Sequence, residues 1–481
     1  ERQDRLSVLS FMLFYTRGYD MKSEVNLTEG SIAKNIIKFA IPMFIGNLFQ
    51  QLYNVADSLV VGNFLGSDAL AAVTSTGSLI FLLVGFFNGT AMGAGVIIAR
   101  FFGAKDHENV KKAIHTDMAF GILCGAIMTL VGVIFAPQIL TLMDTPEDVF
   151  VQSVLYIRIY FLGSIAVVLY NVCMGIMQAV GDSRHPLYYL IFSSVVNILL
   201  DLLFNGVFKL GVEYAALATI ISQLLATLMC LWRLTGKSQT YRVELRKIGF
   251  DKGLLKQIVG IGLPSGLQNS IISIANVVIQ ANINAFGSAA MAGCGAYFKI
   301  EGFVFLPITC FSMALTTFIG QNLGAKQYDR AKKGAAFGIF CSITLAEVIG
   351  ILVYFFMPRL ILLFNAEADV VNYGILQAHT ESLFYFLLAF SHTVAGIMRG
   401  AGKSTVPMFV MLGCWCIFRI TYVTIITSII PTIQVVFWAY PITWSLSSVV
   451  FLIYLLKADW IHNFDRQEDR RRKINARRNG L

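Results

Sequence analysis

Three residues able to bind an ion interrupt long apolar stretches in the first half of the sequence. Asp57 lies in NVADSLV, and Asp201 lies in VNILLDLLF, four residues after Asn197. Residues i and i+4 share one face of a helix, so Asn197 and Asp201 point the same way. Two carboxylates and an amide suit a proton or, through their oxygens, Na⁺. The alternatives are that Asp57 lies at a helix end among lipid headgroups and that Asp201 makes a structural hydrogen bond.

Five amides form a second polar group and occupy matching places in the two halves of the chain: Gln50, Gln51 and Asn54 near Asp57, and Gln268 and Asn269 further on. Lining of an internal cavity and hydrogen bonding between helices fit these amides equally well.

Charged residues also interrupt apolar sequence in the second half. Lys299 and Glu301 stand in AYFKIEGFVFLP, where they either face a central cavity or pair with each other. Glu347 and Arg419 have a structural ion pair as the alternative to a functional role. Ionisable groups inside a membrane are costly and mostly face a cavity. We therefore place Lys299 and Glu301 with the five amides in a candidate substrate cavity, and we leave the roles of Glu347 and Arg419 open.

The composition says what must position these side chains. Of 481 residues, 56% are hydrophobic and only 14% are charged, against roughly 25% charged in an average soluble domain. Such a chain is too apolar for most soluble classes and for disorder, which leaves an all-α polytopic membrane protein. The eight cysteines stand in apolar stretches without the spacing of a disulfide framework or a zinc site. We expect no metal and no cofactor.

Apolar segments of about 20 residues, long enough to cross a bilayer, occur twelve times. Their approximate ranges are 36–63, 70–99, 115–136, 153–179, 186–208, 213–234, 254–285, 290–319, 335–357, 375–399, 406–429 and 433–456.

Lys and Arg cluster in alternate connections between these segments. The even-numbered connections and the C-terminal tail are basic, whereas the odd ones hold only Lys209 and Arg359. This bias places both termini in the cytoplasm and the spans in the cell membrane. It also accounts for the net charge of +9, so we expect the lipid bilayer and not nucleic acid as a partner.

An internal repeat covers the whole set of spans. FFGAKDHENVKKA and NLGAKQYDRAKKG match at an offset of 324 − 103 = 221, and GIMQAVGDSRHP and GIMRGAGKSTVP match at 396 − 175 = 221. Two six-helix lobes in the same orientation follow, with a cavity at their interface. The predicted boundaries are an upstream extension or added segment at 1–20, lobes at 21–234 and 254–457, a basic cytoplasmic linker at 235–253, and a basic cytoplasmic tail at 458–481.

The two lobes differ where charge is buried. The repeat partners of Asn197 and Asp201 are Phe418 and Tyr422, and the partner of Asp57 is Val278 or Ile279. This asymmetry favours a cation site confined to the N-terminal lobe.

Several of these motifs resemble the multidrug and toxic compound extrusion (MATE) family. The resemblance rests on A-x-P near the start of the first span, VADSLVVGNFLG with its acid, the GAK loop followed by paired lysines, and GIMQAVGDSRHP. It covers residues 30–457. It implies an antiporter that expels cationic, amphipathic compounds in exchange for H⁺ or Na⁺, with two six-helix bundles arranged in a V around a central cleft.

The resemblance also suggests a branch. Asp57, Asn197 and Asp201 match the coupling residues of the DinF-like branch. The NorM-like branch has further acids in spans 7 and 10, and neither NSIISIAN nor LLAFSHTVAG contains one. We therefore place the chain nearer the DinF-like, Gram-positive multidrug exporters, and we expect a monomer.

Other functions fit less well. A lipid-linked oligosaccharide flippase of the same superfamily is the main alternative, but such proteins often carry extra spans or a strongly cationic cavity. An enzyme is disfavoured because there is no HExxH and the six histidines are scattered. The physiological substrate is not specified by these patterns.

Overall fold

The computed structural model describes residues 25–143, 145–236 and 241–469, and within these ranges the regular structure is helical throughout. Residues 1–20 fall outside the described part. The helices of the first half are α2 (Ile32–Leu65), α3 (Ser67–Gly103), α4 (His107–Leu142), α5 (Glu147–Leu162), α6 (Ser164–Ala179), α7 (Arg184–Asp201) with the π-helical segment η1 (Leu202–Val207), and α8 (Val212–Leu234).

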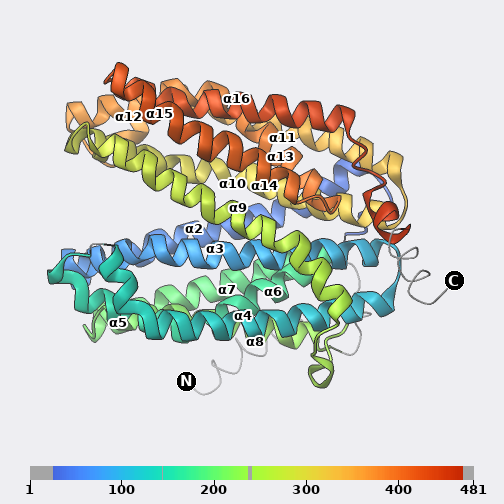
Figure 1. The fold of residues 1–481 in the computed structure, drawn as a ribbon. Coiled ribbons are helices and arrows are strands. Elements are labelled where there is room, and N and C mark those ends of the chain that lie inside the picture. The colour runs from blue at the N-terminus through green and yellow to red at the C-terminus, as the bar shows by residue number, and fades with distance from the viewer. Residues whose placement is uncertain (1–24, 144, 237–240, 470–481) are drawn as a thin grey trace.

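The second half repeats this plan after a linker that contains one short helical turn, η2 (Leu245–Lys247). Its helices are α9 (Lys252–Asn284), α10 (Ser288–Gly324), α11 (Tyr328–Ile361), α12 (Ala368–Glu381), η3 (Ser382–Phe384), α13 (Tyr385–Gly400), α14 (Thr405–Met411), the π-helical η4 (Leu412–Phe418), α15 (Arg419–Ile429) and α16 (Ile433–Lys457). Figure 1 shows the helices of the two halves as two groups lying side by side.

The helices account for the twelve predicted spans. In the part of the chain that the structure describes, ten helical stretches are long and apolar enough to cross a membrane, and α5 with α6, bent by 48°, makes an eleventh. The remaining predicted span corresponds to the 37-residue α3. The protein is therefore a multi-pass, all-α membrane protein, as predicted.

Contacts between the halves follow the repeat. A Cβ on Gly103 of α3 would lie 1.9 Å from the carbonyl oxygen of Gln321, and one on Gly324 of α10 would lie 1.9 Å from that of Arg100. The offset of 221 residues maps Gly103 onto Gly324 and Arg100 onto Gln321, so each contact is the repeat counterpart of the other. Lys105 and Lys326, related by the same offset, both take the left-handed backbone conformation just after these helices, with φ of 58° and 57°. The repeat seen in the sequence is thus a two-fold relation in space.

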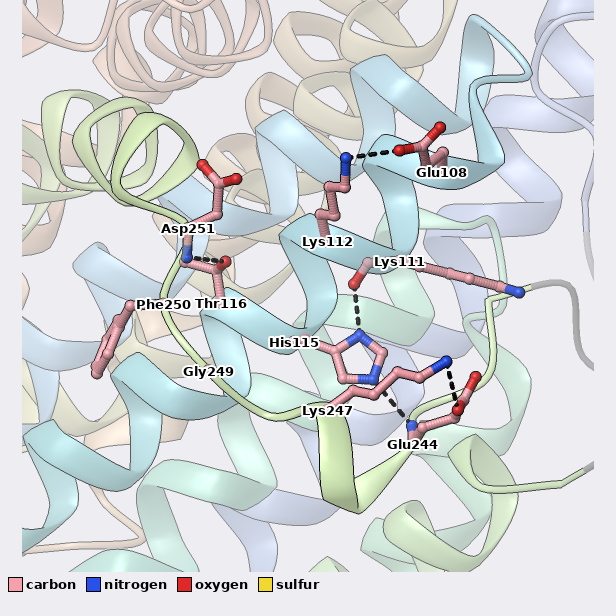
Figure 2. Close-up of a pocket in the computed structure, with 10 residues that line it drawn as sticks. All are labelled: Glu108, Lys111, Lys112, His115, Thr116, Glu244, Lys247, Gly249, Phe250 and Asp251. Atoms are coloured by element: carbon pink, nitrogen blue, oxygen red, sulfur yellow. Dashed lines mark hydrogen bonds and ion pairs between the residues drawn. The ribbon is translucent and has the colours of Figure 1, made fainter.

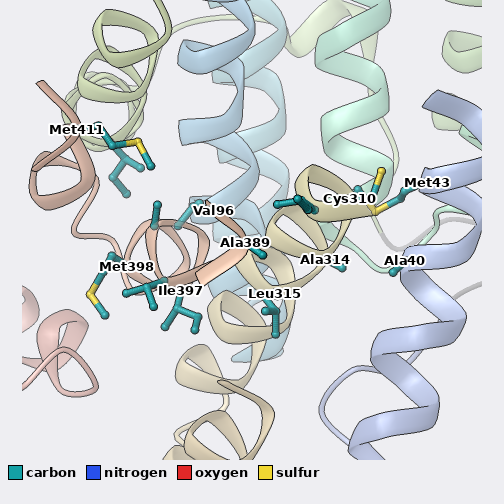
Figure 3. Close-up of a cluster of buried hydrophobic side chains, with 14 of the residues drawn as sticks. Ala40, Met43, Val96, Cys310, Ala314, Leu315, Ala389, Ile397, Met398 and Met411 are labelled. Carbon is teal, nitrogen blue, oxygen red and sulfur yellow. The ribbon is translucent and has the colours of Figure 1, made fainter. Parts of the chain in front are cut away.

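The hydrophobic core runs from one half into the other where α3 meets α10. Figure 3 shows Val96 of α3 and Met43 of α2 together with Cys310 of α10 and Met398 of α13. The amide of Asn47 on α2 donates to the Cys310 sulfur across 3.2 Å. The two lobes consequently share one packed interior at this level.

Candidate functional site

Asp57 and Asp201 come together inside the N-terminal lobe. Asp57 lies on α2, and Asp201 is the last residue of α7, which packs against α2. Their carboxyl groups are within hydrogen-bonding reach of each other. Asp201 is fully buried, and neither of its oxygens accepts a hydrogen bond from a donor in the described residues. Because two adjacent carboxylates in a dry site repel, one proton shared between them satisfies both.

The surroundings of this pair are polar but uncharged. The Tyr53 side chain on α2 lies close to Gln50 and to Gln223 on α8. Tyr156 of α5 closes the site and is buried. Gln50 therefore faces the carboxylate pair in the N-terminal lobe. Tyr53, Tyr156 and Gln223 were not singled out in the sequence, because a tyrosine or glutamine in an apolar helix carries little signal.

Asn197 lies one turn before Asp201, on the same face of α7, as predicted. Its amide nitrogen is 3.4 Å from the Thr219 hydroxyl of α8, and its carbonyl oxygen has no donor among the described residues. Directly after Asp201 the chain widens into the π-helical η1. Such segments are frequent at functional sites, since they change the direction of neighbouring side chains.

A separate cavity of about 590 Å³ is lined mainly by the C-terminal lobe. Its wall comes from α9, α10, α13, η4, α15 and α16, and Gly85 and Met92 of α3 close one side. Gln268, Asn269 and Glu301 of the predicted cavity residues lie on this wall. Gln268 also donates to the Met411 sulfur at 2.8 Å, and Asn269 donates to the Gly85 carbonyl at 3.4 Å.

Three other predicted cavity residues lie elsewhere. Lys299 is exposed and its ammonium group stands 6.0 Å from the centre of the Phe364 ring, so it neither lines this cavity nor forms an ion pair with Glu301. The alternative pairing of Lys299 with Glu301 is thus wrong. Gln51 of α2 lies beside Gly302 of α10, and Asn54 is exposed. Gln51 therefore lies at the contact between the lobes.

Glu301 belongs to a hydrogen-bonded cluster that sequence reasoning missed. The Tyr297 hydroxyl lies 3.4 Å from Glu301, 3.2 Å from Glu381 and 2.8 Å from the Tyr385 hydroxyl. Gln377 donates to the other oxygen of Glu381 at 2.9 Å. Glu381 is fully buried in span 10, six residues before the acid-free stretch LLAFSHTVAG. An acid within a predicted span was the signal that would have found it.

Arg419 and Glu347 do not pair. Arg419 begins α15, directly after the π-helical η4. It donates to the Thr443 hydroxyl at 3.0 Å, and its guanidinium lies 4.5 Å from the centre of the Tyr440 ring. Both Arg419 and Glu301 line the cavity, whereas Glu347 lies outside it on α11. The ion pairs found within the described residues include neither Glu347 nor Arg419, so the alternative of a structural ion pair is not met for either residue.

Two more basic side chains on the cavity wall, His392 and Arg399, come from α13. Arg399 is the last residue of the predicted span 375–399, and the charge pattern counts it with the basic residues of the cytoplasmic connection that follows. The structure places it in the last turn of α13, where it is buried. There it donates to the Ser312 hydroxyl of α10 at 3.2 Å. The helix continues further than the apolar stretch, so the side chain points back into the lobe.

A shallower cavity of about 450 Å³ lies where the linker meets α4 (Figure 2). His115 accepts the Glu244 backbone N–H at 3.0 Å and contacts the Lys111 carbonyl at 2.6 Å, and Asp251 N–H donates to Thr116. Lys247 pairs with Glu244 at 2.8 Å and holds the pKa of that carboxyl below its ordinary value. These contacts fix the linker on α4, and we read this cavity as structural.

Two lobes of membrane helices, a pair of carboxylates inside the first lobe and a cavity lined mainly by the second are typical of membrane transporters. The MatE family model matches residues 42–203 and again residues 264–425. The chain belongs to the MATE family, a family of transporters and not of enzymes. The double match falls on the two predicted lobes.

Individual relatives agree. The chain is 30% identical to the probable multidrug resistance protein YoeA of Bacillus subtilis over 80% of this chain and 85% of that protein. It is 25% identical to the multidrug export protein MepA of Staphylococcus aureus (strain MSSA476), over 89% of this chain and 95% of that protein. Among solved structures, a MATE protein in complex with MaL6 superposes with a TM-score of 0.86 at 24% identity, covering 92% of this chain and 99% of that one.

Proposed function

We propose that this protein exports cationic, amphipathic drugs or toxic metabolites in exchange for H⁺, with Na⁺ as the alternative coupling ion. The cargo class is supported by the relatives named as multidrug exporters and by Glu301, which stands among aromatic side chains on the wall of the cavity. The protein acts as a monomer in the cell membrane with both termini in the cytoplasm.

The observation that carries the coupling mechanism is the Asp57–Asp201 pair. Burial disfavours two negative charges in contact, so the pair alternates between a state with a shared proton and a doubly charged state. In the doubly charged state the two carboxylates repel each other, so α2 and α7 are held together less tightly. Asn197 is then free to hydrogen-bond a different partner. We infer that proton binding repacks these helices and thereby drives cargo release. H⁺ is favoured over Na⁺, because Na⁺ needs more oxygen ligands than two carboxylates and one amide supply.

Alternating access requires that the lobes separate first on one side and then on the other. At the ends predicted to be cytoplasmic, Gly103 and Gly324 bring α3 and α10 into backbone contact. The C-terminal tail joins this closure: Glu468 lies 3.8 Å from Arg100, and Phe464 stacks under the same guanidinium at 4.4 Å. Gly66 and Gly287, at the opposite ends, have no atom within 4 Å of an added Cβ. This arrangement supports a state closed on the cytoplasmic side.

The coupling proposal is tested by accumulation of tetraphenylphosphonium in proteoliposomes with an imposed pH gradient, Na⁺-free buffer and zero membrane potential. We expect uphill accumulation by the wild type and none by Asp57→Asn or Asp201→Asn, although both variants still bind the cation. Asp117→Asn is the matched control, since Asp117 is a buried acid of the same lobe outside the pair. Full accumulation by both Asp57→Asn and Asp201→Asn defeats the site, and activity only with a Na⁺ gradient defeats the proton assignment.

A further inference from the structure

Arg399 is a buried cation that has no acidic partner in the part of the chain that the structure describes. Its side chain is 8% exposed, and its Nε has no hydrogen-bond acceptor in the described residues. The ion pairs found within those residues do not include Arg399. Among the described residues its one acceptor is the Ser312 hydroxyl, which is itself fixed by donating to the His392 carbonyl at 2.7 Å. A buried charge that is not paired is costly to the protein, so a role for the charge is expected.

The charge is directed into the C-terminal cavity, together with one more unsatisfied group. Arg399 and His392 are two turns apart on one face of α13 and both line the cavity. The Nε2 atom of His392 is buried and has no partner among the described residues. Both groups therefore offer polar atoms to whatever occupies this part of the cavity.

The acidic side of the same cavity lies at a different depth. Glu301 and Ser312 are both on α10 and are eleven residues apart, which corresponds to about 16 Å along the helix. Glu301 contacts the Tyr297 hydroxyl there, while Ser312 marks the position of Arg399. Arg419 lies on the same wall and close to both Glu301 and Glu381, so two carboxylates stand against one guanidinium at this end. The wall near Arg399 carries no acid among the described residues, and the cavity is therefore more acidic near Glu301 and positive near Arg399.

Aromatic side chains connect the two ends. The rings of Phe305 and His392 meet edge to face at 5.2 Å, and His392 meets Trp415 in the same way at 5.3 Å. Such a wall accepts a flat aromatic body without demanding a particular shape. The cavity therefore combines an aromatic middle with charged ends of opposite sign.

We propose that this cavity binds amphipathic zwitterions, with the ligand's carboxylate on Arg399 and its cationic group on the Glu301 side. The inference rests on the proposed function in one respect, that the cavity is the cargo site, and it adds to the cationic cargo class a preference for cations that also carry an anionic group. A carboxylate on Arg399 gains charge-assisted hydrogen bonds in a dry site, which its ester cannot make.

Rhodamine B and its ethyl ester test this directly, because they share one aromatic cation and differ only in the free carboxylate. Binding to purified protein is followed by dye fluorescence anisotropy, without any ion gradient. We expect the wild type to bind rhodamine B more tightly than the ester. Arg399→Gln should lower rhodamine B affinity about tenfold, the loss of one charge-assisted hydrogen bond, and should leave ester affinity unchanged.

Arg158→Gln is the matched control, since Arg158 is an exposed arginine of α5 far from the cavity wall, and it should keep the wild-type preference. Arg399→Lys, which retains the positive charge, should keep part of the preference for rhodamine B over the ester. Equal or tighter binding of the ester by the wild type overturns the inference, and this result does not depend on whether any variant folds. A preference for rhodamine B that survives in folded Arg399→Gln overturns it as well. Absence of binding by both dyes would contradict the cargo cavity itself, whereas failure of proton-driven uptake leaves this binding preference unaffected.

Discussion

The Tyr297 hydroxyl has one proton to donate and two carboxylates within reach. Glu381 is additionally held by Gln377 and is closed off from the cavity, whereas Glu301 lies on the cavity wall. Tyr385 can donate to Tyr297 and so complete a chain of hydrogen bonds that ends on either acid. We therefore assign cargo contact to Glu301 and the positioning of Tyr297 to Glu381.

The assignment predicts that Glu301→Gln selectively weakens transport of cations. The amide keeps the shape and can still interact with Tyr297, but it no longer attracts a positive charge, so cation affinity should fall by roughly tenfold at unchanged protein level. Lys299→Gln, two residues away but exposed and outside the cavity, is the control and should leave efflux unaffected. Efflux assays on cells together with immunoblots provide the measurement. Equal loss for both variants, or loss together with poor expression, would show a structural role.

Single residues could be predicted where one polar group interrupts an apolar run. That signal found Asp57, Asn197 and Asp201, which the structure brings together, and Glu301, which it places on a cavity wall. It could not find Arg399, because a basic residue next to GAGKS at a helix end looks like loop charge. Its inward direction depends on packing of α13 against Ser312 of α10, which is a contact between distant segments.

At the scale of elements, the crossing of α3 and α9 joins the two lobes. Gly89 and Gly93 of α3 face Gly266 and Gly262 of α9, and an added Cβ on either α3 glycine would lie 2.4 Å from a backbone nitrogen of α9. Each pair has the spacing Gly-x-x-x-Gly, which lets membrane helices approach closely. The crossing thus depends on the absence of side chains on both helices.

Gly93→Ala should therefore destabilise the protein. The methyl group would meet backbone atoms, which cannot turn away as a side chain can, so the helices must separate, at a cost of about 1–3 kcal/mol. Gly85→Ala on the same helix is the control, because a Cβ there meets nothing within 4 Å. Thermal unfolding in detergent should show a lower Tm for Gly93→Ala and a Tm near wild type for Gly85→Ala. An unchanged Tm for Gly93→Ala would refute this account of the crossing.

Hydropathy was sufficient to find the spans but not their interruptions. The break between α5 and α6 occurs at Gly163, where an added Cβ would lie 2.4 Å from Ile220. The π-helical η1 and η4 stand next to Asp201 and Arg419. These irregularities depend on packing between helices, so no periodic pattern in the sequence predicts them. They nevertheless help to set the direction of the neighbouring charged side chains.

At the scale of the molecule, the sequence repeat predicted two lobes but not how they meet. The offset of 221 residues reappears in the paired contacts of Gly103 and Gly324. Closure at one end depends instead on contacts between lobes and on the tail, which no repeat can specify. The two lobes have also diverged in chemistry: the first places Asp57 beside the fully buried Asp201, and the second lines most of a cavity with charges of both signs.

The central claim is that the Asp57–Asp201 pair exchanges its proton in response to cargo. The most direct measurement is proton release when tetraphenylphosphonium, which cannot itself titrate, is added to purified protein in weakly buffered, Na⁺-free detergent solution near neutral pH. We predict that binding by the wild type releases up to about one proton per bound cation, since a single proton is shared by the pair. The variant with both Asp57→Asn and Asp201→Asn should bind the cation and release none. Binding by the wild type without proton release, or equal release by the double variant, would contradict the account.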